Sequence, residues 1–409
     1  MTTLRIALRN YADFEAALGE EAQAFELMHP GVTVELVPSG IHELHDAALT
    51  EGGLRDGRFD LALLVTDWLA EGVASGALED LEGWNQHAAL VGWPEEWARS
   101  LVRPVLFGKV VSALPWHDGP ECLVYRKDLF ADEHNQSEFR RRFGRELTPP
   151  TTWRHLEETA RFFTDSAKGL YGTVFAAFPD GHNTLYDFAL QVWSRGGELT
   201  DEAGNPRLNS REAEAGLEYY RRVVRDAELC HPQSAELDST QSGDVFLNGE
   251  VVMMANWFGF AARAGRAGSP LAGKVAIGPI PTDGVNAPVS LSVFWALGMG
   301  SGSKNKAIAW EFLRFVAEPH RDLARTRHGT VGVRLSTWRD PGLRARIPAY
   351  REIEEISLGA RQLPVGERMA ELAAIVDKVV TRALTTSDTT RVILEDAQQE
   401  ANAKGLTFR

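Results

Sequence analysis

The sequence has few cysteines and no long apolar run. Only Cys122 and Cys230 occur in 409 residues. A disulfide between them is possible but not implied, and Cys122, in the strand-like stretch CLVYRK, fits a buried free thiol. Two cysteines neither prove nor exclude an oxidising compartment. No apolar run approaches the length that spans a bilayer, so direct membrane insertion is not expected.

Positive charge is also scarce. The formal net charge is −14, whereas a nucleic-acid partner requires a concentrated basic face. The arginine-rich stretch EFRRRFGR at 138–145 is too short and isolated to supply one, and it fits the solvated face of a helix better. The composition therefore argues against nucleic-acid binding.

The amino terminus lacks a recognisable export signal. MTTLRIALRN enters an alternating strand pattern directly, with no basic segment followed by an apolar one. This pattern predicts either a protein that stays in the cytoplasm or a sequence from which a leader has been trimmed.

The length and patterning predict two α/β domains. A chain of 409 residues exceeds what one core normally serves, and 44% hydrophobic with 24% charged residues is typical of a globular protein. Apolar runs at 4–9, 32–40 and 59–67 read as strands, separated by helical patterns at 13–31 and 41–57. This alternation is the βα repeat of a parallel sheet. Later strands are expected at 171–177, 251–256, 274–281 and 293–300, and helices dominate from Ile353 onward.

Four motifs resemble one protein family. They are FDLALLVTDWLAEGVASGALEDLE, LPWHDGPECLVYRKDLF, LNGEVVMMANWFGF and ALGMGSGSKNKAIAWEFLRFVAEP, in that order. Together they resemble the extracellular solute-binding proteins of ABC importers, in the maltose-binding-protein-like, sugar-binding group.

The resemblance implies an α/β periplasmic-binding-protein type II fold with two lobes, a hinge and a ligand cleft between the lobes. The N-terminal lobe would hold 1–116 and 279–325, and the C-terminal lobe would hold 117–278 and 326–409. The implied function is capture of a sugar or oligosaccharide for an importer's membrane permease subunits, outside the cytoplasm, with no reaction, cofactor or metal.

Ligands of open α/β sheets bind beyond the carboxyl ends of strands. The candidate ligand-binding residues are therefore those at strand ends and at the crossing between lobes. They are Asn10, Tyr11, Ser39, Asp67, Trp68, Trp116, His117, Glu121, His182, Asn183, Tyr186, Trp257, Phe258, Ser292 and Trp295.

Aromatic rings, carboxylates and amides suit a carbohydrate. Rings stack on the apolar faces of a pyranose, and carboxylates accept hydrogen bonds from its hydroxyls. Trp257 and Phe258 then form a stacking wall, or else they plug the core. Strand alternation sends these two neighbours to opposite sides. Asp67 contacts ligand or caps the following helix, and Trp68 points to ligand or core.

Arg334, in GTVGVRLSTW, extends the range of ligands. It is expected either to contact an anionic group by a bidentate pair or to bridge the lobes. Polyols and phosphorylated or sulfonated sugars therefore stay open as alternatives.

Enzyme motifs fit the sequence poorly. HELH at 42–45 lacks the spacing of a helical zinc pair, and GMGSGSK at 298–304 matches neither phosphate-loop pattern. A cytoplasmic α/β enzyme such as a glycosidase, with two carboxylates across a cleft, stays open as a different class.

Two proline- and glycine-containing stretches are expected to act as hinges. Pro115, Gly119 and Pro120 surround the first crossing, and Pro279, Pro281 and Gly284 lie in the second. Such segments absorb dihedral changes while sheets stay rigid.

Overall fold

The computed structural model describes residues 1–283, 287 and 289–409, and it divides the chain into two compact units. Unit 1 comprises Met1–Gly119 and Ser292–Ala345, and unit 2 comprises Pro120–Leu291 and Arg346–Arg409. Relative to the expected lobes, residues 117–119 and 326–345 lie in unit 1, and residues 279–291 lie in unit 2. The chain passes between the units three times, as the expected lobes also require, but at different positions. Gly284 of the expected second hinge lies outside the described residues.

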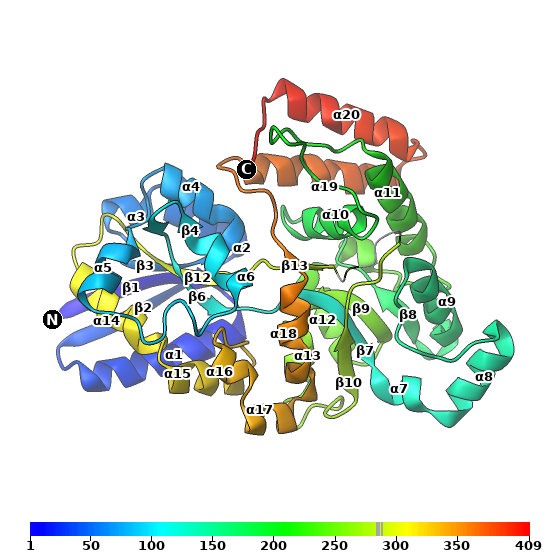
Figure 1. Cartoon of the computed structure of the whole chain (residues 1–409), viewed down its shortest axis with the longest axis horizontal. Helices are drawn as coiled ribbons and strands as arrows, with labels where there is room; N and C mark the ends of the chain where they lie inside the picture. The colour runs from blue at the N-terminus through cyan, green and yellow to red at the C-terminus, as the bar shows by residue number, and fades with distance from the viewer. Residues whose placement is uncertain (284–286, 288) are drawn as a thin grey trace. The chain divides into compact units, whose positions relative to one another are not determined.

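Unit 1 is built on a five-stranded sheet with the order β2-β1-β3-β12-β6 (Figure 1). β1 (Thr2–Arg9) pairs in parallel with β2 (Val32–Ser39) and with β3 (Leu61–Val65). β12 (Trp295–Met299) runs antiparallel to β3 and to β6 (Leu114–His117). All five residues of β3 are buried, as a strand covered on both faces should be. The strands predicted at the amino terminus and at 293–300 are confirmed.

Short helices complete unit 1. The first helix, α1 (Ala12–Met28), buries Phe14, Leu18 and Phe25 as its periodicity predicts, but Met28 is 62% exposed. The predicted helix at 41–57 is divided into α2 (Ile41–His45), a π-turn (Asp46–Thr50) and α3 (Gly53–Asp56). The other main helices are α4 (Leu69–Ala74), α5 (Leu81–His87), α6 (Arg99–Val102), α14 (Lys306–Val316), α15 (Pro319–Arg325), α16 (Leu335–Trp338) and α17 (Pro341–Arg346).

Unit 2 is built on a four-stranded sheet with the order β10-β7-β9-β8. β7 (Glu121–Arg126) runs antiparallel to β10 (Val275–Gly278) and to β9 (Val251–Trp257). β8 (Tyr171–Val174) is parallel to β9. The first six residues of β9 are buried and Trp257 is partly exposed. The apolar run at 251–254 is therefore a strand covered on both faces, as predicted.

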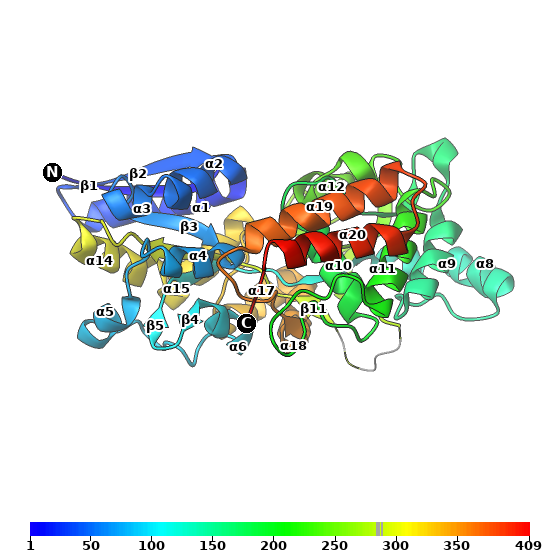
Figure 2. The ribbon, with the colours of Figure 1, turned by 90° about the horizontal axis from the view of Figure 1, so that it is seen from above.

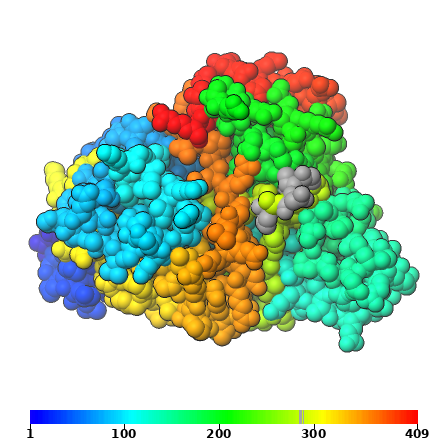
Figure 3. Space-filling view, in the orientation of Figure 1, coloured from blue at the N-terminus to red at the C-terminus, as the bar shows by residue number. Residues whose placement is uncertain are grey.

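Helices surround the sheet of unit 2. α10 (Asn183–Trp193) is buried along its whole length. It packs against α11 (Arg211–Val224) and α19 (Met369–Thr385), and α20 (Thr390–Ala403) lies beside α19 (Figure 2). The others include α7 (Lys127–Ala131), α8 (Glu133–Phe143), α9 (Trp153–Phe163), α12 (Ser239–Leu247), α13 (Phe258–Ala264) and α18 (Ile353–Leu358). The arginine-rich stretch forms part of α8, which lies on the visible surface of unit 2 (Figure 3).

The two cysteines are free and buried in unit 2. Burial raises the pKa of both thiols, with that of Cys230 at about 12. Within the described residues no helix is long and apolar enough to cross a membrane.

A buried ion pair connects three elements of unit 1. The Arg325 guanidinium donates to Glu21 Oε1 at 3.1 Å and to the Trp116 carbonyl at 2.6 Å. The Trp116 indole N–H donates to the other Glu21 oxygen at 3.1 Å. Helix α1, helix α15 and strand β6 are thus joined through one arginine. Because each charge is fully enclosed, losing one partner leaves the other uncompensated.

Arg325→Ala should therefore destabilise unit 1 by about 3–5 kcal/mol. The matched control is Arg327→Ala, which removes an exposed arginine paired with Glu20 and should cost about 0–1 kcal/mol. Urea unfolding of both variants measures the difference. Equal midpoints would show that the buried pair contributes nothing to stability.

Candidate functional site

Aromatic side chains gather where the strands of unit 1 end. This aromatic patch consists of Tyr11, Phe14, Trp68, His117 and Trp295. Trp295 pairs in register with Val65, the last residue of β3, and with His117, the last residue of β6. Phe14 lies edge-on to Trp295 at 5.5 Å and to His117 at 4.9 Å. The antiparallel β12 thus brings residues nearly 300 positions from the amino terminus beside the ends of the first strands.

The patch continues on both sides of Phe14 and Trp295. Tyr11 approaches Phe14 edge-on at 5.0 Å, and Trp68 approaches Trp295 at 6.2 Å. Tyr11 and His117 are partly exposed, whereas Trp68 and Trp295 are nearly buried. The patch therefore has an accessible rim of two polar-tipped rings.

His117 is held neutral in this patch. Its Nδ1 accepts a hydrogen bond from the Val331 N–H at 2.9 Å, so the ring proton lies on Nε2. Burial, aided by the Arg325 guanidinium, lowers the pKa of His117 to about 3. A neutral imidazole with a fixed Nε2–H can donate to a ligand oxygen.

Predicted polar residues follow the parallel strands. Asn10 comes directly after β1, and its N–H donates to the carbonyl of Ser39, the last residue of β2, at 2.7 Å. Asp67 lies in the short turn Thr66–Trp68 after β3 and is partly exposed. Ser292 precedes β12, and its hydroxyl is enclosed without a hydrogen-bond partner among the described residues.

The structure corrects the prediction that Trp116 contacts ligand. The register of β6 with β12 shifts beside Trp116, and the Trp116 ring lies edge-on to Phe14 at 5.4 Å. The Trp116 indole is buried against Glu21 and Arg325. It therefore belongs to the core of unit 1.

The structure also corrects the prediction for Arg334. Its side chain is 0% exposed and donates to the carbonyls of Ala317 at 2.7 Å and Val91 at 2.9 Å. The guanidinium also pairs with Glu96 and lies 4.2 Å from the Trp97 ring centroid. All four partners belong to unit 1, so Arg334 fixes loops of that unit instead of meeting an anionic ligand or bridging the lobes.

A second group of predicted residues meets in unit 2. We call it the acid–aromatic cluster, and it consists of Glu121, His182, Tyr186, Asp187 and Trp257. Glu121 of β7 lies opposite Trp257 of β9 in the strand register. Tyr186 packs edge-on to Trp257 at 5.7 Å, and its hydroxyl lies 3.1 Å from His182 Nδ1. Helix α10 and two sheet strands thus build one cluster.

The two carboxyl groups of the acid–aromatic cluster are buried. Glu121 is 4% exposed and Asp187 is 7% exposed. Burial, together with the nearby Asp187 charge, raises the pKa of Glu121 well above its ordinary value. Burial raises the pKa of Asp187 to about 7, although a 2.6 Å hydrogen bond from the Tyr220 hydroxyl opposes the rise. Burial therefore favours the protonated form of both carboxyl groups.

Asn183 bonds to Asp180 at the start of helix α10, beside this cluster. As the first residue of α10, it donates its backbone N–H to Asp180 Oδ1 at 2.8 Å, and its amide side chain also contacts that carboxylate. The His182 N–H donates to the same oxygen at 3.0 Å. Asp180 thus fixes the start of α10, which carries Tyr186 and Asp187.

The two adjacent aromatic residues at the end of β9 differ in how far they are buried. Phe258 is 0% exposed and packs edge-on to Tyr350 at 4.9 Å. The Phe258 N–H donates to the Pro120 carbonyl at 3.1 Å. Trp257 remains partly exposed. Phe258 is therefore the core plug, a correction to its predicted ligand contact, and Trp257 alone is available from this pair.

Several residues of these groups are not among the candidates that the sequence indicates. Phe14 lies on the apolar face of α1, where helical periodicity predicts a core residue, and it is also the centre of the aromatic patch. Tyr220 and Asp180 carry no local signal, because their partners follow from the packing of α11 and from the loop before α10. Spacing alone indicates only that Phe14 lies one helical turn after Tyr11.

The enzyme motifs have structural roles. In HELH, His45 Nε2 bonds to Glu71 at 2.8 Å, and no group of three potential metal ligands occurs in the described part of the chain. GMGSGSK forms a turn in which the Ser303 hydroxyl donates to Asp60 at 2.5 Å, before α14 begins at Lys306.

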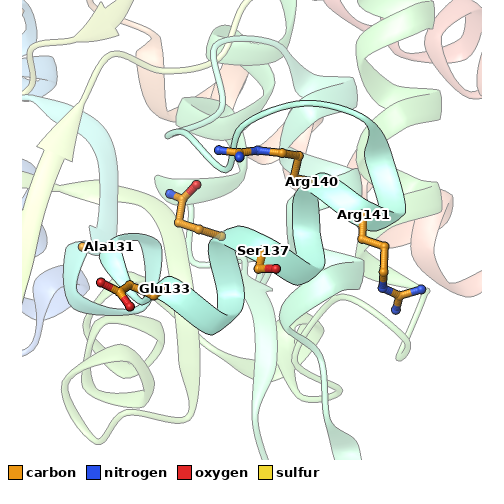
Figure 4. Close-up of a pocket in the computed structure, with 6 residues that line it drawn as sticks. Ala131, Glu133, Ser137, Arg140 and Arg141 are labelled. Carbon is orange, nitrogen blue, oxygen red and sulfur yellow. The ribbon is translucent and has the colours of Figure 1, made fainter.

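A hollow of about 570 Å³ lies away from both groups, on α8 (Figure 4). Its lining includes Glu133, Ser137, Arg140 and Arg141 of this single helix. The arginines pair with Glu138 and Glu146 at the surface. Because its arginines are paired with neighbouring glutamates at the surface, nothing in this hollow indicates a bound ligand.

The family model described as bacterial extracellular solute-binding protein matches residues 10–320. The chain belongs to this family. A Brucella abortus (strain 2308) protein whose name assigns it as a binding protein is 24% identical over 311 residues, which cover 75% of this chain and 70% of the relative.

Two solved structures share the fold. Maltose-bound MalE3 of T. maritima has a TM-score of 0.85 at 22% identity, covering 99% of this chain and 100% of the other. An Agrobacterium radiobacter K84 ABC transporter solute-binding protein in complex with ribitol has a TM-score of 0.84 at 22% identity, covering 98% of each chain. The predicted two-lobed α/β solute-binding fold is thereby confirmed.

The contrast between Phe258 and Trp257 can be measured in the unliganded protein. Phe258→Ala should cost about 3–5 kcal/mol of stability, because it leaves a cavity in the core of unit 2. Trp257→Ala should cost much less, since its side chain is already partly exposed. Thermal unfolding of both variants tests the assignment, and similar losses would place both rings in the core.

Proposed function

We propose that the protein is the substrate-binding component of an ABC importer and that it captures a sugar or a polyol. One observation carries this proposal. In each unit, aromatic rings lie beside hydrogen-bonding oxygen atoms at the ends of the sheet strands. The named ligands of the two structural relatives, maltose and ribitol, support this class. The family's name supports an extracytoplasmic location, and the partners would be membrane permease subunits.

The chemistry of the two groups suits polyhydroxylated ligands. An aromatic face accepts the C–H face of a sugar, and Asp67, His117 and Glu121 offer hydrogen bonds to hydroxyls. Hydrogen bonds to charged groups contribute about 1.5–3 kcal/mol each. We propose that each group by itself offers rings and hydrogen-bonding groups to such a ligand. A few such bonds with one or two rings give micromolar affinity, about −8 kcal/mol.

The proposal does not include an anionic ligand at Arg334, since that guanidinium is buried and both of its terminal nitrogens donate to groups of unit 1. The chemistry of these residues alone does not exclude an enzymatic reaction. The family, however, comprises binding proteins, so binding without turnover is the function proposed.

A thermal-shift screen with sugars and polyols tests the class of ligand, because a bound ligand raises stability with the logarithm of its concentration over Kd. With a ligand from that screen, Trp257→Ala should weaken binding about tenfold or more, a loss of about 1.4 kcal/mol. Trp84→Ala, which alters a partly exposed tryptophan on α5, is the matched control. Calorimetry that finds unchanged affinity for Trp257→Ala would remove Trp257 from the site.

Asp67→Asn tests the contribution of unit 1. The substitution keeps the shape of the side chain and removes its charge, so binding should weaken by about 1–3 kcal/mol. Asp56→Asn, at an exposed position of the same unit, should leave affinity unchanged. If Asp67→Asn lowers the melting temperature at full affinity, Asp67 is a structural residue of the turn after β3.

A further inference from the structure

We infer that the acid–aromatic cluster of unit 2 binds a protonated amine, so that the captured ligand is an amino sugar or amino polyol. The inference rests on the proposed function, because it specifies the ligand of the same protein. Its basis is a pair of buried carboxyl groups in unit 2, one of which has an oxygen atom without a hydrogen-bond partner among the described residues.

The first observation is an enclosed acid with an unused oxygen. Glu121 Oε2 has no hydrogen-bond partner among the described residues. In the part of the chain that the structure describes, no lysine or arginine is among the groups that act on the charge of Glu121 or Asp187. A buried carboxylate in this state is costly. An ammonium group compensates that charge and donates up to three hydrogen bonds, whereas a neutral hydroxyl supplies one hydrogen bond and no charge.

The second observation is that two further carboxylates lie beside the amino-terminal end of α10. The Asp180 charge raises the pKa of Asp187, and burial followed by the Asp180 charge contributes to the raised pKa of Asp377. Asp377 accepts from the Gly181 N–H at 2.9 Å. The one basic side chain of the cluster is His182. The local field therefore favours a cation.

The third observation is an aromatic ring at the open side of the cluster. Trp257 is partly exposed and lies directly opposite Glu121 across the β7–β9 pair. Side chains at directly opposed positions share one face of the sheet. Tyr186 packs edge-on to this ring. A cation beside a carboxylate can also contact the face of a tryptophan, which is the most favourable aromatic partner.

Proton balance gives this mode of binding a signature. Burial raises the pKa of both carboxyl groups and so favours retention of a proton on the pair, whereas an incoming ammonium favours the ionised carboxylates. Binding of R–NH₃⁺ therefore releases that proton to solvent, and no bond in the ligand is broken. A neutral sugar has no such effect. The other titratable groups that influence the carboxyl pair or its neighbours are Cys122, Asp180, His182, Tyr220 and Asp377.

Matched pairs of neutral and amino compounds provide the test. Calorimetry at pH 6.5 would compare glucosamine with glucose, galactosamine with galactose, and 1-amino-1-deoxysorbitol with sorbitol. At least one amine should bind about tenfold or more tightly than its hydroxyl parent. Repeating the titration in buffers of different ionisation enthalpy should show proton release for the amine only.

Two variants then assign the effect to Glu121. Glu121→Gln keeps the size of the side chain and should remove most of the preference for the amine. Glu202→Gln, at an exposed position of unit 2, should retain it. Neutral compounds that bind as tightly as their amines, without proton release, would overturn this inference and leave the proposed function intact. If no neutral or amino compound binds, maltose and ribitol included, that result would count against both the amine inference and the proposed function.

Discussion

The antiparallel pairing of β7 with β9 is the constraint on which the site in unit 2 depends. Its register sets Glu121 opposite Trp257, and the buried residues before Trp257 prevent β9 from slipping. Because β9 is covered on both faces, the register is fixed at its end, where a slip of one residue would move Phe258 out of its packing against Tyr350. The carboxyl group and the ring are therefore neighbours because the core of the sheet requires that register, not because of any attraction between them.

The aromatic patch of unit 1 follows from the same kind of constraint. β12 enters the sheet between β3 and β6 and runs antiparallel to both. Its first residue, Trp295, consequently lies beside the last residues of its two neighbours. The buried contact of Arg325 with the Trp116 carbonyl then holds β6 in place. Each unit thus offers rings and acceptors at the ends of strands whose interiors form its core.

Most strands could be predicted from the sequence because their apolar runs are local signals, as at 59–67 and 251–254. Trp257 and Phe258 could be separated in principle, since alternation places neighbours on opposite faces. The same argument could not assign Trp116, because the register of β6 with β12 shifts beside it. Arg334 could not be assigned, because its partners Val91 and Ala317 are distant in sequence and are carbonyl oxygens. The pairing of Asp187 with Tyr220 likewise depends on how α10 packs against α11.

The most direct test of the account is to ask which compound the protein retains and in what state. Purified protein would be dialysed against a mixture of sugars, polyols and their amino derivatives, and the retained fraction would be released by denaturation and identified by nuclear magnetic resonance. The account predicts one retained class of polyhydroxylated compound, in a one-to-one ratio with protein and chemically unchanged. Retention of none, or recovery of a cleaved or modified product, would contradict it.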